Sequence, residues 1–174
     1  MSEQATQRLI NKLHALVGPA GLLTDADAQA PYLTDWLGKW KGATPVVVRP
    51  ANTAETAAVV RLCSETHTPI VTQGGNTGMS GGATPDASGA QVVLSTTRMS
   101  RVRAIDPINN TQTVDAGAHQ LVTDHGGSIS AEHGVGQLRR DELRLYKSPV
   151  EMELMLRIKQ AMDPNHLMSP GKLL

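Results

Sequence analysis

The sequence is poor in aromatic side chains and in cysteine. Phe is absent, aromatic residues make up 2% of the 174 residues, and Cys63 is the one cysteine. The core must therefore be built from Val, Ile, Leu, Met and Ala without large aromatic anchors. A single cysteine excludes an internal disulfide framework, which favours a reducing, cytoplasmic setting.

An excess of either charge is also lacking. Lys and Arg number 16, as do Asp and Glu, and basic residues are not interleaved with aromatic ones. Nucleic acid and anionic membrane surfaces therefore have no electrostatic reason to bind. No apolar run approaches the ~20 residues of a transmembrane helix, and the polar first residues do not resemble a signal peptide. These absences favour an enzyme or binding module that handles a small molecule.

Two helices are predicted near the ends of the sequence. Residues 4–17 carry leucines and a valine on one helical face, and residues 24–44 read as an irregular lead-in. Ser148, Pro149 and Glu151 form a capping-box start for a helix that reaches about Met162. Its apolar stripe is interpreted as core: Val150, Leu154, Met155, Ile158, Ala161 and Met162.

The part between these helices predicts strands around a third helix. A strand at 46–48 is followed by a helix over 53–66, capped by Asn52, and by a second apolar strand that ends near Thr72. Further strands are expected at 91–95, 102–105 and 111–114. The fold class is therefore α+β, with a parallel sheet edge that carries a glycine loop at its carboxyl end.

The glycine loop "TQGGNTGMSGGA" is the first candidate site. It combines five glycines with short polar side chains: Gly74, Gly75, Gly78, Gly81 and Gly82 with Asn76, Thr77 and Ser80. Such a backbone allows several N–H groups to converge on an anion such as a pyrophosphate. The loop fits neither the P-loop nor the GxGxxG pattern. A flexible hairpin tip is the alternative.

The stretch "GGSISAEHGVG" is the second candidate site, with Glu132 beside His133. A histidine serves as a general base near neutral pH, and a carboxylate binds a divalent metal or orients an imidazole. One Glu and one His make an incomplete metal site, and His125 has no supporting spacing. From the residues alone, a solvated loop and a catalytic loop both remain open.

Both halves resemble one family of flavoproteins. Residues 45–83 resemble the start of the FAD-binding domain of the vanillyl-alcohol-oxidase type (PCMH-type), and residues 126–174 resemble the end of its D-2-hydroxy acid dehydrogenase branch. That branch contains D-lactate and D-2-hydroxyglutarate dehydrogenases and the glycolate oxidase FAD subunit. The resemblance implies a partial FAD-binding domain, a mixed sheet with flanking helices, followed by a helical C-terminal segment.

The resemblance also implies roles for residues. The loop from Gly74 to Gly82 would bind the FAD pyrophosphate, and His133 would take the hydroxyl proton of a D-2-hydroxy acid while hydride moves to the flavin. Glu132 would bind a divalent metal, Zn or Mn. The closing "SPGK", with Lys172, resembles an "NPGK" element near the flavin.

The sequence departs from the family in its middle. A second glycine-rich segment and a substrate-binding cap with an "HxGDGNxH" metal motif are missing, and the character changes near Gly117, as at an internal deletion. We therefore expect three parts: an N-terminal helix with an irregular lead-in at 1–44, the first part of the FAD-binding domain at 45–118 and the catalytic-loop and helical segment at 119–174. The expected function is FAD-dependent oxidation of a D-2-hydroxy acid, weak or absent in this chain alone. The alternative is a non-catalytic remnant or interaction module, and an oligomer or partner chain stays open.

Overall fold

The computed structural model describes residues 2–106, 108, 111–117 and 148–171 of the chain. Helices and strands are mixed, as the α+β prediction states. The helices are α1 (Glu3–Val17), α2 (Ala26–Gln29), α3 (Thr53–Glu65) and α6 (Pro149–Met162), with the 3₁₀ turns η1 (Pro19–Gly21) and η2 (Ala30–Tyr32). The strands are β1 (Leu22–Leu23), β2 (Val47–Val48), β3 (Ile70–Gln73), β4 (Val92–Ser95), β5 (Val102–Asp106) and β6 (Thr111–Val114). None of the helices described is long and apolar enough to cross a membrane.

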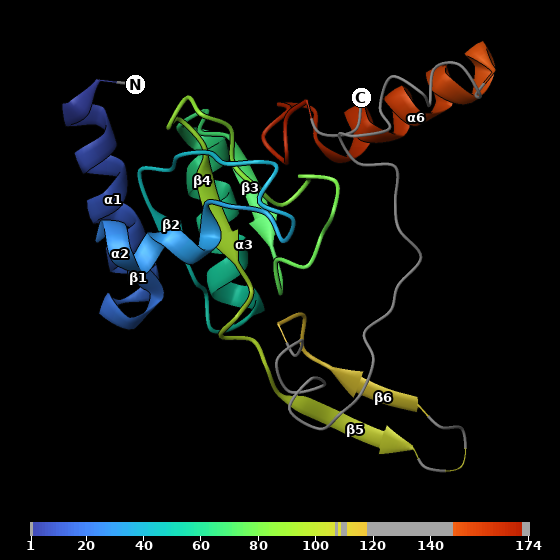
Figure 1. Cartoon of the computed structure of the whole chain (residues 1–174), viewed down its shortest axis with the longest axis horizontal. Helices are drawn as coiled ribbons and strands as arrows, with labels where there is room; N and C mark the ends of the chain where they lie inside the picture. The colour runs from blue at the N-terminus through green and yellow to red at the C-terminus, as the bar shows by residue number, and fades with distance from the viewer. Residues whose placement is uncertain (1, 107, 109–110, 118–147, 172–174) are drawn as a thin grey trace.

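Four strands form the central sheet in the order β1-β2-β4-β3 (Figure 1). β2 and β3 both pair with β4 in parallel, and β1 adds an antiparallel edge. The predicted unit of strand, helix and strand over β2, α3 and β3 is confirmed, and β3 lies at the sheet edge as expected. Its two strands are not neighbours, because β4 lies between them.

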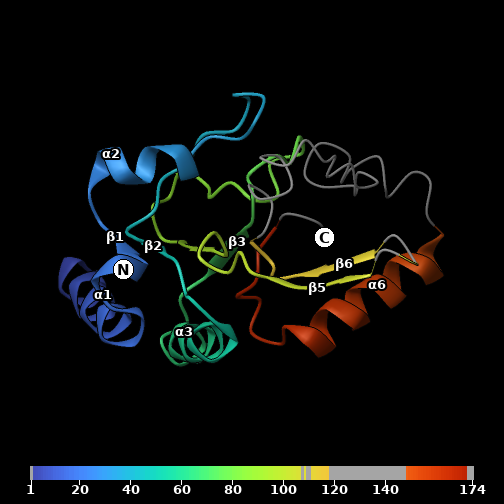
Figure 2. The ribbon, with the colours of Figure 1, turned by 90° about the horizontal axis from the view of Figure 1, so that it is seen from below.

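The sheet is buried on both faces. On one face, apolar side chains of α1 and α3 pack on β2, β3 and β4 (Figure 2). Val47, Val71 and Val93 point to the other face and are also fully buried, on the side where α2 and the segment after it lie. Continuous apolar strands are typical of parallel sheets covered on both faces. The lead-in predicted over residues 24–44 is thus one of the two covering layers.

Capping residues set the helix starts. The Asn52 side chain accepts a hydrogen bond from the Glu55 N–H at 2.9 Å, and the Glu55 carboxylate accepts one from the Ala51 N–H at 2.8 Å. Ser148 and Glu151 form the predicted capping box, and Pro149 is the first residue of α6. Each cap satisfies N–H groups that the first helical turn leaves without partners.

The prediction that the apolar stripe of α6 is core is wrong. None of its residues is buried, and Val150 and Met162 are 76% and 81% exposed. Leu154 and Ile158, between them, are 57% and 51% exposed. The helix reaches away from the central sheet (Figures 1 and 2). The periodicity identifies the helix correctly, but the sequence does not say which element covers its apolar face.

The turn after α6 joins the edge of the central sheet. Met168 forms a parallel bridge with Ile70, whose N–H donates to the Leu167 carbonyl at 2.5 Å. The Ser169 N–H donates to the Ile70 carbonyl at 2.7 Å. Because the pairing is parallel, the chain then runs along β3 in the direction of the glycine loop.

Candidate functional site

The glycine loop lies directly after β3, at the carboxyl end of the parallel strands. Ligands of open α/β sheets bind at this edge, because loops from neighbouring strands meet there. The loop follows Gln73, whose buried side chain donates from Nε2 to the carbonyls of Tyr32 and Ala83 at 3.0 and 2.9 Å. One glutamine thus ties both ends of the loop to the lead-in.

Asn76 fixes the middle of the loop to the same segment. Its Nδ2 donates to the Thr34 carbonyl at 2.8 Å and to the Pro31 carbonyl at 3.2 Å. Its φ of +54° lies in the left-handed region, which asparagine adopts more readily than most residues. The loop is therefore held in one shape by the lead-in, which favours a preorganised site over a loose hairpin tip.

The glycines differ in the space around them. A Cβ on Gly81, where φ is +67°, would lie 2.7 Å from ring atoms of Trp40. Gly78 and Gly82 have nothing within 4 Å of the position of a Cβ. The packing of Trp40 and the positive φ thus require glycine at position 81, whereas Gly78 and Gly82 leave open backbone that a ligand can approach.

Two buried polar groups beside Gly81 have no partner within the described residues. These are the indole N–H of Trp40 and the hydroxyl of Thr84, whose backbone N–H donates to the Gly81 carbonyl at 3.3 Å. Buried polar groups are rarely left without partners. They mark a place next to the loop where a ligand atom or a water molecule would be stabilised.

The end of β4 completes this edge. The Thr96 N–H donates to the Gln73 carbonyl at 2.9 Å, and the Thr96 hydroxyl donates to the Ala116 carbonyl at 3.2 Å. A Cβ on Gly117 would lie 1.8 Å from the Thr96 carbonyl oxygen, so only glycine fits there. The backbone of β3, β4 and residues 115–117 therefore meets within hydrogen-bond distance at the start of the glycine loop.

A buried carboxylate anchors this junction. Asp115 accepts hydrogen bonds from Arg103 and from Arg101, the latter at 3.3 Å. The Arg103 hydrogen bond, with that of Arg101, holds the pKa of the Asp115 carboxyl below its usual range. The carboxylate links the start of β5 to the end of β6 and stays ionised at neutral pH.

Asp163 holds the C-terminal turn against α6. It accepts the Leu167 and Met168 N–H groups at 2.8 and 3.0 Å and pairs with Lys159, whose Nζ also donates to the Met168 carbonyl at 2.8 Å. Burial alone would raise the pKa of Asp163, but Lys159 and the two N–H groups outweigh it and lower that pKa. We call these contacts of Asp163 with Lys159, Leu167 and Met168 the Asp163 latch. The latch positions Ser169, Pro170 and Gly171 of the "SPGK" element.

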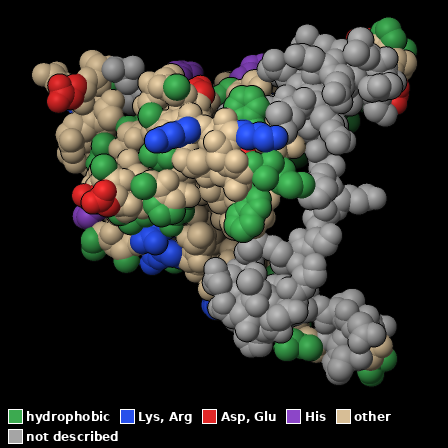
Figure 3. Space-filling model, viewed as in Figure 1, with side chains coloured by type: hydrophobic (Ala, Val, Ile, Leu, Met, Phe, Trp, Pro, Cys, Tyr) green, Lys and Arg blue, Asp and Glu red, His purple; other side chains and the backbone are tan. Residues whose placement is uncertain are grey.

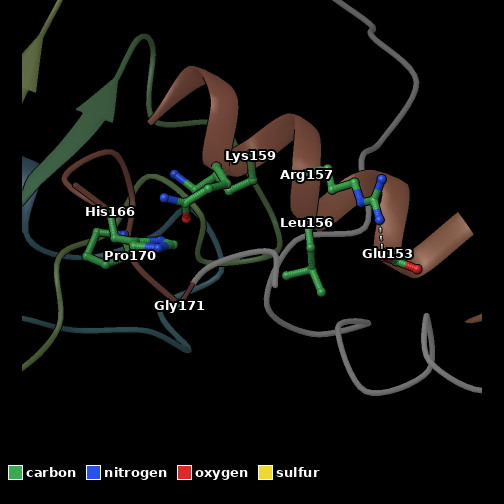
Figure 4. Close-up of a pocket in the computed structure, with 8 residues that line it drawn as sticks. Glu153, Leu156, Arg157, Lys159, His166, Pro170 and Gly171 are labelled. Atoms are coloured by element: carbon green, nitrogen blue, oxygen red, sulfur yellow. Dashed lines mark hydrogen bonds and ion pairs between the residues drawn. The ribbon is translucent and has the colours of Figure 1, made fainter. Parts of the chain in front are cut away.

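A half-open cavity of about 310 Å³ lies between α6 and this turn (Figure 4). Leu156 points into it from α6, and His166 and Pro170 lie on the opposite wall. Arg157 is paired with Glu153 at 2.5 Å, so its charge is compensated. The wall is mostly apolar, so the cavity offers less to an anion than the glycine loop.

The other predicted site residues lie outside the described residues. These are His133, Glu132 and Lys172. Within the described ranges, no three His, Cys, Asp or Glu side chains are grouped so as to hold a metal ion. The structure therefore places Gly74, Gly75, Asn76, Thr77, Gly78, Ser80, Gly81 and Gly82 in one loop and leaves the catalytic histidine and the metal ligand as predictions.

Comparison with known proteins agrees with this geometry. The family described as "FAD binding domain" matches residues 44–131, half of the chain and all of the glycine loop. The chain belongs to this family. "FAD linked oxidases, C-terminal domain" matches residues 100–173 and overlaps the first match over residues 100–131.

Curated relatives of this flavoprotein family are similar over part of their length. D-2-hydroxyglutarate dehydrogenase of Stutzerimonas stutzeri is 48% identical over 61 residues, which are 35% of this chain and 13% of the relative. The mitochondrial D-2-hydroxyglutarate dehydrogenases of Bos taurus and Danio rerio are 36% and 34% identical over 58% and 66% of this chain. These matches span only 18% and 21% of the two relatives, so the chain matches about a fifth of their length.

Solved structures support the fold alone. Alkyldihydroxyacetonephosphate synthase superposes with a TM-score of 0.56 and 20% identity over 69% of this chain and 25% of the other. p-Cresol methylhydroxylase superposes with a TM-score of 0.52 and 21% identity over 72% of this chain and 26% of the other. The central sheet with its helices is thus part of an FAD-binding domain, and its fold is similar to that of p-cresol methylhydroxylase, as the predicted mixed sheet with flanking helices implied.

The residues present fit the phosphate part of FAD. Gly78 and Gly82 offer open backbone, Asn76 and Gly81 turn the loop, and Trp40 adds a buried N–H without a partner beside it. Such a loop can direct N–H groups at a pyrophosphate.

Sequence reasoning missed how the lead-in supports this loop. Tyr32 and Thr34 contribute carbonyl groups, and Trp40 contributes a ring. Carbonyl groups belong to every residue, so no sequence signal marks the first two. The rarity of tryptophan, with two in the whole chain, was the one available sign for Trp40.

Proposed function

We propose that the chain binds FAD through the Gly74–Gly82 loop and derives from a dehydrogenase of D-2-hydroxy acids such as D-lactate or D-2-hydroxyglutarate. The observation that carries this proposal is the open backbone at Gly78 and Gly82 on a loop held by Asn76 and Gln73. The names of the curated relatives support the substrate class. Bound FAD supplies the acceptor for the hydride removed from such a substrate.

Three further residues of the chain would have separate roles in this reaction. His133 would take the hydroxyl proton, since imidazole is a general base near neutral pH. Lys172 would act near the cofactor, since the resemblance of "SPGK" to an "NPGK" element implies this role. Glu132 would bind a divalent ion only weakly, since a single carboxylate leaves most coordination positions unfilled.

The activity of this chain alone is proposed to be weak or absent. The two family matches overlap within this chain, and the chain matches about a fifth of the length of its relatives. Both observations support the proposal that the middle of the family sequence is shortened here. Oxidation requires the substrate carbon within about 3.5 Å of the flavin, and effective molarity falls steeply when positioning groups are missing. A base by itself contributes only about 10² to 10⁴ in rate.

A non-catalytic remnant that retains FAD or phosphate binding is the second candidate function. The exposure of α6 favours this candidate, because no element in the described part of the chain covers the apolar face of that helix. The cytoplasmic location proposed from the single cysteine remains a prediction, and the names of several relatives place those proteins in mitochondria.

A dye-linked oxidation assay separates the two candidates. The chain is incubated with added FAD, zinc or manganese, and D-lactate or D-2-hydroxyglutarate. We expect a flavin absorption spectrum in the bound fraction and no saturable turnover. Saturable activity that His133→Ala abolishes would show that the chain is an enzyme by itself. A protein that binds neither flavin nor phosphate would contradict both candidates.

A further inference from the structure

The exposed stripe of α6 is an apolar feature that the proposed function does not use. Val150, Leu154, Ile158 and Met162 follow one another at intervals of four residues and are each more than half exposed. Residues four apart lie one above the other on a helix, so the four side chains form a continuous ridge. Hydrophobic and acidic side chains are visible at the outer end of α6 in the space-filling view (Figure 3).

The helix does not need this ridge to stay attached to the protein. It begins at the capping box of Ser148 and Glu151, and its last turn is held by the pairing of Lys159 with Asp163. The turn that follows is bonded to the edge strand at Ile70. The cavity side of α6, with Leu156, faces this turn. The ridge lies on the side of the helix away from Leu156, since 154 and 158 are each about 200° from it.

The charges beside the ridge are arranged so that two antiparallel copies of α6 have complementary charges. Glu153 and Arg157 lie along one edge of the ridge, with the acidic residue toward the start of α6 and the basic residue toward its end. In an antiparallel pair of identical helices, equivalent edges face each other. Glu153 of each copy then lies opposite Arg157 of the other copy, so two equivalent ion pairs form.

We propose that the ridge of α6 binds the same ridge of a second copy of this chain, with the two helices antiparallel. Pairing Leu154 with Ile158 of the second copy also brings Val150 opposite Met162, so all four ridge side chains are covered. Glu153 and Arg157 of the two copies form a symmetric ion-pair group at the edge. A twofold interface of this kind is self-complementary, as closed dimers require.

The charge of α6 argues against a lipid surface as the occupant. The helix carries two glutamates, one arginine and one lysine, so it has no net positive charge to attract anionic lipid. A helix of 14 residues is about 21 Å long, which is short for an interface of standard size. We therefore expect a dimer that forms in a concentration-dependent way, with a dissociation constant above about 1 μM.

Sedimentation velocity over a concentration series of the full chain tests the proposal. The mass should rise from 18.5 kDa toward twice that value. Leu154→Glu should weaken the dimer by at least about tenfold, because it places a charge in the middle of the ridge. Leu156→Glu is the matched control on the opposite side of α6 and should leave the dimer unchanged. Helical circular dichroism verifies that each variant folds, which we expect because none of these side chains is buried.

Charge reversal tests the antiparallel arrangement. Glu153→Arg and Arg157→Glu should each weaken the dimer by about two- to fivefold, as like charges then face each other. The double variant should restore the dissociation constant of the original chain. A monomer at every concentration, a dimer insensitive to Leu154→Glu, or a double variant that remains weak would each overturn the proposal. Binding of the chain to anionic phosphatidylserine vesicles without dimer formation would overturn it in favour of a lipid surface.

Discussion

The ring of Trp40 lies against Gly81, so close that a Cβ on the glycine would be 2.7 Å from it. This contact joins a residue of the lead-in to the glycine loop 41 positions later in the sequence. It packs the lead-in against the loop, so a side chain at position 81 would displace the Trp40 ring.

Gly81→Ala should therefore destabilise the protein. The left-handed φ of +67° costs an L-residue about 1–2 kcal/mol, and the new methyl group would also displace the ring of Trp40. Gly78→Ala has neither problem, since its surroundings are open. Chemical denaturation of the two variants measures the difference, and equal stabilities would contradict the described loop.

Removing the Asn76 amide should loosen the loop without unfolding the sheet. Asn76→Ala loses the hydrogen bonds to Thr34 and Pro31, which contribute about 0.5–1.5 kcal/mol each. Hydrogen exchange should speed up in the loop and stay slow in β3 and β4. Faster exchange in β3 and β4 as well as in the loop would mean that the loop does not open separately from the sheet.

The Asp163 latch should make the C-terminal turn sensitive to acid. Because the pKa of Asp163 is lowered by folding, its stabilisation is complete well above the ordinary value of 3.8 and is lost as the pH falls through the lower value of the folded state. Asp163→Asn should remove this dependence and release the bridge at Met168. Hydrogen exchange of the Ser169 N–H, measured as a function of pH, follows the release. An exchange profile that the substitution leaves unchanged would contradict the latch.

Cys63 should be inert in the folded protein. It is fully buried in α3, and burial raises the pKa of its thiol to about 12, so the reactive thiolate is scarce at neutral pH. A thiol reagent should label the chain only as it unfolds, which makes Cys63 a probe for the variants above. Rapid labelling of the native protein would show that α3 does not cover this side chain.

The sequence predicts the elements better than their surroundings. The caps at Asn52 and Ser148 and the apolar strands are local signals, and the elements they predict are present. The burial of α6 depends on which element lies opposite, and local periodicity carries no information about that. The same holds for the glycine loop: its glycines are visible in the sequence, but its support by Thr34 and Trp40 depends on folding across more than 40 residues.

Titration of FAD into the original chain and into its Gly78→Ala and Gly82→Ala variants shows whether the open glycines of the loop face the cofactor. Both substitutions should leave stability unchanged, since nothing lies within 4 Å of either Cβ, so a change in affinity reports contact with the cofactor. We predict that FAD binds with a dissociation constant above about 1 μM, because many of the contacts expected for the cofactor are missing. Each variant should lose at least about fivefold in FAD affinity. Tight stoichiometric binding would show that the FAD site of this chain is complete, and affinities that both variants leave unchanged would show that the loop does not contact FAD.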